Sequence, residues 1–538
     1  MNKKRRILVL DDEAKWREAL ARILEQAGFH VDTAGSPAEA RELLSTSFYH
    51  LAILDISMTG NPTDDKGMIL LGELDEINLL GAMEVIVLSA YGTQEQMRKA
   101  FRQHKVADFQ SKHDFFDDPS IFVSQVEQTF KDRILINLDL DIHWEQVKDT
   151  EEFVAKLKLH GIALKRDPKL LTRTAAELND LLCRLFHNAR SLLLKPLVPG
   201  QSGSAVLLAT PFYDTGAGQP VIVKFGELEK IDTEYKNFKE FVQPFVGGGR
   251  STHVNDIRRT SHLGGVVYSL LGTAGNKLDS FSAFYELADI VQLRNVLESL
   301  IRETCGAWYA NPGNLQLLDL SDEYKQHLGC TNENLESALA LGLKSVQGKQ
   351  QLYFEGLSEA RGFTNPILVT AEQHFSRPTY KCITHGDLNG SNVLVDGAGH
   401  AWLIDFESTG KGHILRDIAE LDTIVRFHLL GPNEATLEER LRMEQALCAA
   451  KRFSQIDQLA SSFQTENQAL TKAYETVVHL RILAHRLVAQ NPSDDLSEYY
   501  VALMYYSLNS IRFYSWPSLQ RQHALLSASL LADQLLKT

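Results

Sequence analysis

The chain has 538 residues, of which 44% are hydrophobic and 23% charged, and its formal net charge is −14 at pH 7. A chain of this length exceeds a single ordinary hydrophobic core, so we expect two or three domains. The acidic balance disfavours bulk electrostatic binding to nucleic acid, because phosphate backbones require clustered Lys and Arg; a local basic patch stays open.

Five cysteines are scattered along the chain without a CxxC pair or the spacing of a zinc site. This pattern favours reduced thiols in a reducing compartment. The N-terminus is basic and then apolar, as in a signal peptide, but the apolar stretch 7–10 is too short for one. No stretch of the sequence approaches a membrane-spanning helix. We therefore expect a cytoplasmic protein that does not bind a membrane.

Short apolar stretches alternate with helix-like stretches in the first part of the chain. Such apolar stretches are typical of strands that are buried on both faces of a parallel sheet. The alternation predicts a doubly wound, flavodoxin-like α/β domain over residues 1 to about 132. The expected strands are 7–10, 51–54 and 85–88, and the expected helices include 14–27 and 37–44.

Three aspartates follow the first two of these strands: Asp11, Asp12 and Asp55. Ligands bind at the carboxyl ends of the strands in such sheets, so we expect the three carboxylates to converge. A hard cation such as Mg²⁺ resolves their mutual repulsion, and Asp55 then becomes a nucleophile for a phosphoryl donor. Ser89 and Lys112 are placed to contact the incoming phosphoryl oxygens.

The segments DDE, LAILDISM, VIVLSAYG and ADFQSK resemble the receiver domain of two-component response regulators, which act in phosphorelay signalling. The resemblance implies a phosphoprotein whose phosphoacceptor is Asp55 and whose partner is a histidine kinase or a small phosphodonor. It also implies the following roles: Asp11 and Asp12 as the acidic metal pocket, Ser57 as a carbonyl ligand of the metal, Ser89 and Lys112 as the switch pair, and Phe109 as the rotating aromatic.

Two features depart from the family's pattern. The loop 55–67 is longer than usual, and His113 follows Lys112 where the family usually has proline. The alternative hypothesis is a degenerate receiver that no longer accepts phosphate.

Residues 133–190 predict a helical connector. Alternation of apolar and polar residues from Ile136 to Ile142 indicates a strand or an extended link, and 151–159 and 172–186 have helical spacing. The segment would carry a signal between domains. The alternative is a packed spacer or a dimerisation helix pair, which leaves a homodimer open.

Residues 191–538 begin with three expected strands, 191–197, 205–209 and 220–225. The turn between the first two contains Gly200 and Gly203, which are candidate nucleotide-binding glycines, although such a turn alone is more typical of a plain hairpin. Lys224 ends the third strand and Glu234 lies in a helix-like stretch beyond it. This pairing suits a lysine that is held by a glutamate while it contacts nucleotide phosphates.

A second motif is more specific: HGDLNGSNVL, residues 385–394, followed by IDFE, residues 404–407. Asp387 is suited to orient an attacking hydroxyl group or accept its proton, while Asn392 and Asp405 are suited to hold Mg²⁺. The stretches 435–453, 469–488, 497–513 and 518–536 then predict helices.

This motif pair resembles the aminoglycoside phosphotransferase and choline kinase family, a small-molecule branch of the protein-kinase-like fold. The resemblance implies an α+β bilobal domain with a small lobe at about 191–275, a helical lobe at about 276–538, and ATP and Mg²⁺ as cofactors. Gly386 replaces the arginine of protein kinases and no Ala-Pro-Glu motif follows, so an activation-loop switch is not expected. Asp417 corresponds to a structural acidic residue, and His385 is interpreted as a structural hydrogen-bonding group.

We therefore predict a two-component response regulator whose phosphorylation at Asp55 controls an ATP-dependent, kinase-like phosphotransferase. The phosphoryl acceptor is not apparent from the sequence. The principal alternative is a catalytically silent nucleotide-binding scaffold that serves signalling or interaction. A DNA-binding output is disfavoured, because no helix-turn-helix with a basic recognition helix is found.

Overall fold

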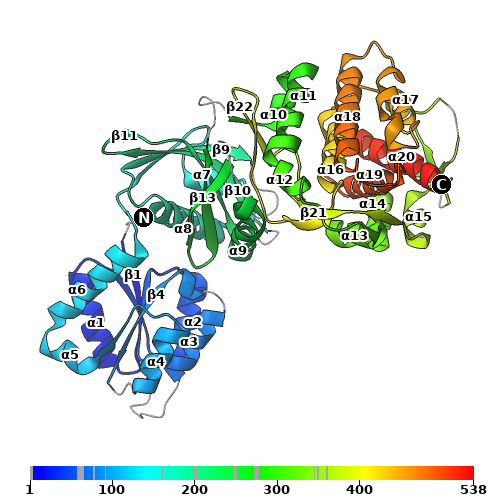
Figure 1. Cartoon of the computed structure of the whole chain (residues 1–538). Helices are drawn as coiled ribbons and strands as arrows, with labels where there is room; N and C mark the ends of the chain where they lie inside the picture. Colours follow the sequence, from blue (N-terminus) through cyan, green and yellow to red (C-terminus); the bar gives the residue numbers. More distant parts are fainter. Residues whose placement is uncertain are drawn as a thin grey trace. The chain divides into compact units, whose positions relative to one another are not determined.

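The computed structural model describes residues 4–56, 66–76, 79–90, 93–159, 162–198, 204–245, 251–271, 278–343, 346–347, 350–358 and 361–537. The chain divides into two compact units (Figure 1). The first comprises Met1–Tyr235 and His253–Ser269, and the second comprises Lys236–Thr252 and Leu270–Thr538. No helix among these described residues has the length and apolar character needed to cross a membrane.

The first unit begins with a five-stranded parallel sheet of order β2-β1-β3-β4-β5. This confirms the predicted flavodoxin-like receiver fold. The strands are β1 (Arg6–Leu10), β2 (His30–Ala34), β3 (Leu51–Leu54), β4 (Glu84–Ser89) and β5 (Asp108–Ser111).

Helices cover both faces of this sheet, and two separate hydrophobic clusters result (Figure 1). Side chains alternate along a strand, so Ile7 and Val9 face one cluster while Leu8 and Leu10 face the other. Helices α1 and α6 pack on the first face, and α2, α3 and α4 on the second. The helices are α1 (Ala14–Gln26), α2 (Pro37–Thr46), α3 (Lys66–Glu76), α4 (Gln94–Gln103), α5 (Lys112–Asp117) and α6 (Pro119–Thr129).

The rest of the first unit is built around a second sheet, of order β13-β14-β12-β10-β9-β6 with β11 beside β10. Neighbours from β9 to β14 are antiparallel, whereas β6 joins β9 in parallel. The strands are β6 (Asp141–Trp144), β9 (Ser191–Val198), β10 (Ser204–Tyr213), β11 (Gly216–Ala217), β12 (Val221–Glu227), β13 (Ser251–Arg259) and β14 (Leu263–Leu271), with a separate pair β7 (Lys158–Leu159) and β8 (Ile162–Ala163).

Helices η2 (Phe130–Ile134), α7 (Thr150–Val154), η3 (Leu164–Arg166), α8 (Pro168–Leu185) and α9 (Leu228–Asn237) accompany this sheet. The segment that we expected to be a helical connector thus contributes β6 and α8 to the core of the sheet, where Leu178 and Leu181 of α8 join Leu207 and Val223. Helix α7 is shorter than predicted, because the chain beyond it pairs as β7 with β8.

The second unit is mainly helical at its C-terminal end, as the sequence predicts (Figure 1). Helices α18, α19 and α20 pack with α16 and α17, and the buried faces of these helices combine apolar residues with charged ones such as Asp422, Glu444 and Arg481. The helices are η4 (Phe238–Val242), η5 (Gln243–Phe245), α10 (Phe281–Leu287), α11 (Ile290–Glu298), η6 (Ser299–Thr304), α12 (Gly306–Tyr309), α13 (Leu320–Leu328), α14 (Asn332–Gly342), α15 (Pro366–Glu372), α16 (Arg416–Ile424), η7 (Val425–Leu429), α17 (Leu437–Leu447), η8 (Phe453–Ser461), α18 (Gln468–Leu487), α19 (Ser497–Ser510) and α20 (Ser518–Leu535).

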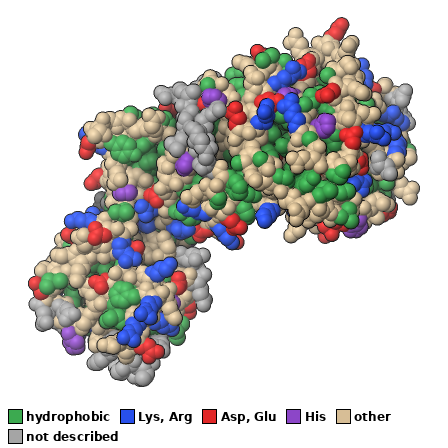
Figure 2. All heavy atoms as spheres, in the orientation of Figure 1, with side chains coloured by type: hydrophobic (Ala, Val, Ile, Leu, Met, Phe, Trp, Pro, Cys, Tyr) green, Lys and Arg blue, Asp and Glu red, His purple; other side chains and the backbone are tan. Residues whose placement is uncertain are grey.

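Short strand pairs frame the loops that carry the second motif. Strand β22 lies between β15 and β23, and β21 pairs with β24. These strands and the other short ones are β15 (Leu278–Ser280), β16 (Gln316–Asp319), β17 (Val346–Gln347), β18 (Gln351–Phe354), β19 (Phe363–Thr364), β20 (Ser376–Thr379), β21 (Lys381–Thr384), β22 (Val393–Asp396), β23 (Ala401–Leu403) and β24 (Gly410–His413). Acidic and basic side chains are interspersed over the visible surface (Figure 2).

Candidate functional site

Three carboxylates meet at the carboxyl end of the parallel sheet. Strands β1 and β3 are neighbours with Leu10 opposite Leu54, so the residues that follow them, Asp11 and Asp55, come together. One oxygen from each of Asp11, Asp12 and Asp55 lies within 4.8 Å of the others. Hard divalent cations such as Mg²⁺ favour this oxygen donor set. The residues present therefore fit the predicted metal.

Lys112 joins this acidic cluster from the end of β5. Its Nζ lies 2.6 Å from Oδ2 of Asp11 and 2.6 Å from Oδ2 of Asp55, and its side chain is buried. Burial alone would lower the pKa of Lys112, but its bonds to Asp11 and Asp55 outweigh burial and raise it. The ammonium therefore stays charged and supplies a fixed positive charge beside Asp55.

Asp11 and Asp55 are both buried, with exposed fractions of 2% and 3%, respectively. Burial raises the pKa of Asp11 to about 6, against the opposing effect of Lys112. Burial is the main cause that raises the pKa of Asp12, and the negative charge of Asp55 raises it further. The cluster thus concentrates negative charge that a bound cation would neutralise.

Ser89 ends β4 and is also buried, and its hydroxyl group has no hydrogen-bond partner among the described residues. A buried, unpaired hydroxyl group is available to an incoming oxyanion. Phe109 lies on the neighbouring strand β5, opposite Val87, and packs against the core while remaining partly exposed. Ser57 lies outside the described residues.

The second predicted site is carried by the loop after β21. The side-chain amide of Asn392 donates to the backbone oxygen of Asp387 at 2.8 Å and to its carboxylate at 2.9 Å. The backbone N–H of Ile404 donates to the backbone oxygen of Asn392 at 3.1 Å, which places the next residue, Asp405, beside this loop. Asp405 has a φ of +71°, an uncommon conformation for a residue other than glycine.

Gly386 sets the backbone of this loop just before Asp387. Its φ is +80°, and a Cβ atom at this position would lie 2.3 Å from the backbone oxygen of Ser408. A side chain such as arginine is therefore excluded here by the backbone. Asp417 fixes the turn, because its carboxylate accepts from the backbone N–H groups of His385 and Gly386 at 2.8 and 3.0 Å.

In the first unit, Lys224 on β12 forms an ion pair with Glu234 on α9, so the two residues that the sequence analysis paired do lie together. Both side chains are buried. The hydroxyl group of Tyr268 on β14 donates to Glu234, a contact that no sequence pattern indicated. The glycines predicted to cover the nucleotide, Gly200 and Gly203, lie outside the described residues.

No sequence pattern indicated Glu420, which is buried beside the second loop. Its carboxylate accepts from the backbone N–H of Leu388 at 2.7 Å. Burial, followed by the charge of Asp387, raises its pKa well above the usual range. Glu420 and Leu388 are 32 residues apart in the sequence, so no local pattern indicates that they are neighbours.

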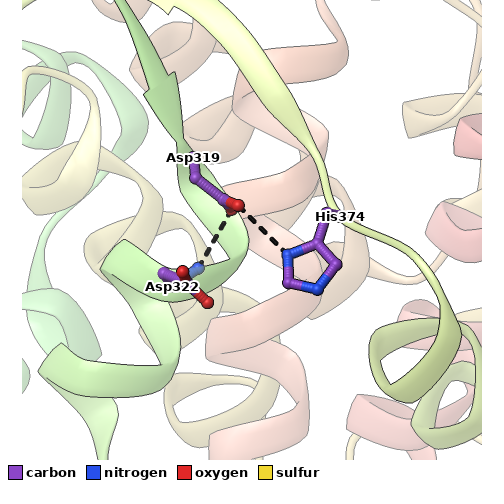
Figure 3. A group of neighbouring side chains, drawn as sticks. All are labelled: Asp319, Asp322 and His374. Carbon is purple, nitrogen blue, oxygen red and sulfur yellow. Dashed lines mark hydrogen bonds and ion pairs between the residues drawn. The ribbon is translucent and has the colours of Figure 1, made fainter.

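A further acidic group lies in the second unit and consists of Asp319, Asp322 and His374 (Figure 3). Asp319 caps helix α13, since its carboxylate accepts from the backbone N–H groups of Ser321 and Asp322 at 2.9 and 3.2 Å. Its other oxygen lies 3.1 Å from Nδ1 of the exposed His374. Helix capping and a surface contact account for this group.

The sequence matches known families at two places. The family described as "Response regulator receiver domain" matches residues 7–127. Response regulator RR06 of Streptococcus pneumoniae serotype 2 (strain D39 / NCTC 7466) is 35% identical over 95 residues, which are 18% of this chain and 41% of that protein. The chain thus spans about two fifths of the length of that relative.

Solved structures of receiver domains match about a quarter of the chain. The CheY-like receiver domain from Methanospirillum hungatei JF-1 is 23% identical and covers 24% of this chain and 98% of its own, with a TM-score of 0.20. TrrA from Thermotoga maritima, solved in complex with Mg(2+)-BeF, is 30% identical and covers 23% of this chain and 98% of its own, with a TM-score of 0.19.

The family described as "Ternary complex associated domain 9" matches residues 189–365 and 362–512. Together these matches span more than half of the 538 residues. The chain therefore belongs to the ternary complex associated domain 9 family, and it carries a response regulator receiver domain ahead of the family's segment.

Proposed function

We propose that the chain is a phosphorylation-controlled signalling protein, whose Asp55 accepts a phosphoryl group from a histidine kinase or a small phosphodonor. The convergence of Asp11, Asp12 and Asp55 with Lys112 carries the proposal. It brings the nucleophile, a set of metal ligands and a fixed cation into one pocket. Receiver domains in two-component systems take their phosphate in this way.

The chemistry follows from the position of each group. A carboxylate oxygen of Asp55 attacks phosphorus, the new O–P bond forms, and the bond to the donor's leaving group breaks with its electron pair. When bound by the three aspartates, Mg²⁺ would neutralise charge on the phosphoryl oxygens. Lys112 offers its ammonium to another of these oxygens, and the hydroxyl group of Ser89 is available to a third.

A direct test treats the full chain with acetyl phosphate and Mg²⁺ and detects phosphorylation by intact mass. Wild type should gain one phosphoryl group, whereas Asp55→Asn should gain none and chelation of Mg²⁺ should abolish the gain. The fluorescence of Trp16 provides a second readout of phosphorylation, since Nζ of Lys112 lies 4.9 Å from the centroid of the Trp16 ring. Equal phosphorylation of wild type and Asp55→Asn would contradict the proposal.

We further propose that the ternary complex associated domain 9 segment acts as an ATP- and Mg²⁺-dependent phosphotransferase of the kinase-like type. Support comes from the Asn392–Asp387 hydrogen bonds and from the buried Lys224–Glu234 ion pair. Asp387 would orient the acceptor hydroxyl group, Asn392 and Asp405 would hold the metal, and Lys224 would contact the nucleotide phosphates.

The rival function is a scaffold that binds nucleotide without turnover, which the family's description as part of a ternary complex also suits. ATP binding and ATP consumption, measured together, separate the two. Asp387→Asn should retain ATP binding and reduce turnover by about 10²-fold or more if the segment is an enzyme. Lys224→Ala should weaken binding itself. ATP binding by wild type without any turnover, over a panel of hydroxyl acceptors, would favour the scaffold.

Control of the second segment by the receiver is part of the same proposal. Beryllofluoride, added with Mg²⁺, should change ATP turnover or the oligomeric state of wild type but leave Asp55→Asn unaffected. Light scattering during size-exclusion chromatography would reveal a homodimer. Identical turnover and mass for treated and untreated wild type would rule out this control.

A further inference from the structure

A cavity of about 160 Å³ lies within the first unit, away from both sites described above. It is bounded by residues before and within β4, by helix α8 and by the end of β13. Its wall carries four arginine side chains and one carboxylate: Arg133, Arg184, Arg258, Arg259 and Glu84. Guanidinium groups are well suited to bind oxyanions through paired, charge-assisted hydrogen bonds.

Arg184 is the most rigid of these side chains and is only 5% exposed. Its Nε donates to Asp180 at 2.8 Å, and its Nη1 donates to the backbone oxygens of Ala82 and Arg259 at 2.6 and 3.0 Å. Its Nη2 is buried, and no described residue accepts a hydrogen bond from it. Arg184 also lines the cavity, so its fixed guanidinium group adds positive charge to the wall.

The carboxylates that pair with these arginines lie mostly outside the cavity wall. Arg259 donates to Asp232 at 2.7 Å and Arg258 lies 3.1 Å from Asp256, but neither aspartate lines the cavity. Asp180, the partner of Arg184, does not line it either. Glu84, which contacts Arg133 at 2.9 Å, is the one carboxylate in the wall among the described lining residues.

We propose that this cavity is a binding site for a small tetrahedral oxyanion of the phosphate type. Guanidinium groups match the geometry and charge of phosphate oxygens, and the fixed charge of Arg184 adds to the attraction. The volume holds a phosphate ion with a few waters but lies below the range of pockets for larger ligands, so a nucleoside does not fit.

A bound anion would contact the receiver domain, α8 and β13 together. Binding only to the folded first unit raises its stability by mass action. The site is independent of Asp55 and of the Asp387 loop, so its success or failure is separable from the proposed function.

Isothermal titration of the full chain with inorganic phosphate, in buffer containing EDTA, tests the site. Sodium chloride at matched ionic strength controls for screening, and adenosine monophosphate tests whether a phosphate attached to a nucleoside is admitted. We expect phosphate to bind wild type and adenosine monophosphate not to bind at this site.

The variants locate the site. Arg184→Gln and Arg258→Gln should each weaken phosphate binding about ten-fold, the effect of losing a charge-assisted hydrogen bond. Arg258 is partly exposed, so its variant remains informative if Arg184→Gln does not fold. Arg173→Gln is the matched control, because Arg173 also lies on α8 and bonds the receiver at Ser45 but does not line the cavity.

Phosphate binding that is equal in wild type, Arg184→Gln and Arg258→Gln would overturn the proposal, as would no phosphate binding to wild type. A thermal shift of wild type by phosphate, lost in Arg258→Gln and kept in Arg173→Gln, would support it.

Discussion

At the scale of single residues, Gly386 shows how the backbone constrains the second loop. The residue combines a positive φ with a backbone oxygen 2.3 Å from the position of a Cβ atom. Gly399 in the same unit has a similar φ of +82°, but its nearest neighbour would lie 3.8 Å from the Cβ. A side chain at Gly399 would therefore meet backbone strain alone, whereas one at Gly386 would meet backbone strain and a steric clash.

Alanine at each position should give different losses of stability. Gly399→Ala should lower the free energy of unfolding by about 1–2 kcal/mol, the strain of the left-handed conformation alone. Gly386→Ala should lower it by roughly 4 kcal/mol or more, because the chain near Ser408 must also move. Urea unfolding of both variants measures the difference, and equal losses would contradict the steric argument.

Another residue-scale effect concerns pH. His523 is fully buried, and burial lowers its pKa to about 4, against the opposing effect of Glu444 and with a smaller contribution from Arg440. In the unfolded chain its pKa is the ordinary 6.5. As pH falls from 6.5 to 4, the unfolded state binds a proton that the folded state does not, so stability falls.

Between pH 8 and pH 5 this histidine should remove roughly 2 kcal/mol of stability. His523→Gln should flatten the pH dependence over this range, whatever its effect at pH 8. The exposed His374 is a suitable control, and His374→Gln should keep the wild-type slope. Urea unfolding at a series of pH values gives the slopes, and an unchanged slope in His523→Gln would refute the assignment.

At the scale of elements, helix α8 carries an unexpected second buried face. Its apolar residues, such as Leu178 and Leu181, pack on the second sheet as the helical spacing predicts. Glu177, Asp180 and Arg184 are also buried, although their spacing resembles a solvated polar stripe. The partners that satisfy them are distant in sequence, and local patterns do not reveal such pairs.

Asp180 is the centre of this polar face. His50 Nε2 lies 2.6 Å from one of its oxygens and Arg184 donates to the other at 2.8 Å. Burial would raise the pKa of Asp180, but Arg184 and His50 outweigh burial and lower it to about 2. The carboxylate is therefore charged at all ordinary pH values and needs both partners.

Replacing this carboxylate should leave the buried guanidinium group of Arg184 without compensation. We expect Asp180→Asn to destabilise the first unit by about 3–5 kcal/mol. Asp167→Asn on the same helix should change stability by less than about 0.5 kcal/mol, because Asp167 caps the helix and Asn caps equally well. Chemical unfolding followed by the fluorescence of the first unit compares the two, and losses of the same size would argue against the buried network.

Three strands of the receiver, β1, β3 and β4, were predictable because each is an apolar stretch that ends at or just before a chemically distinctive residue. The acidic pocket followed from the same fact, since Asp11 and Asp55 end neighbouring strands. Strands β2 and β5 mix polar and apolar residues and were not predicted. The Asp387 loop was found from its spacing. Tyr268 and Glu420 were not, because their partners are brought close by the fold and are far away along the chain.

At the scale of the whole molecule, the chain has two compact units, each with its own buried core. Receiver and second sheet belong to the same unit, in which α8 buries charged side chains against both. Units with independent cores usually unfold separately, whereas parts that share a buried network unfold together.

Calorimetry of the full chain should therefore show two transitions. Asp180→Asn should lower the midpoint temperature of the first unit's transition, and Gly386→Ala should lower that of the second unit's transition. Each variant should leave the midpoint of the other unit within about 2 °C of the wild-type value. The receiver should not give a third transition of its own. A single transition shifted by both variants would show that the units unfold as one.

Strand β3 gives this arrangement a mechanical consequence. His50 immediately precedes the strand and Asp55 immediately follows it, so the phosphoacceptor and the contact with α8 terminate the same four-residue strand. An extended strand of four residues spans about 13 Å. Strand β3 is hydrogen-bonded to β1 on one side and to β4 on the other, which limits its bending. A displacement of Asp55 along the axis of β3 would therefore be transmitted to the buried imidazole of His50 through the strand alone, without an intervening loop.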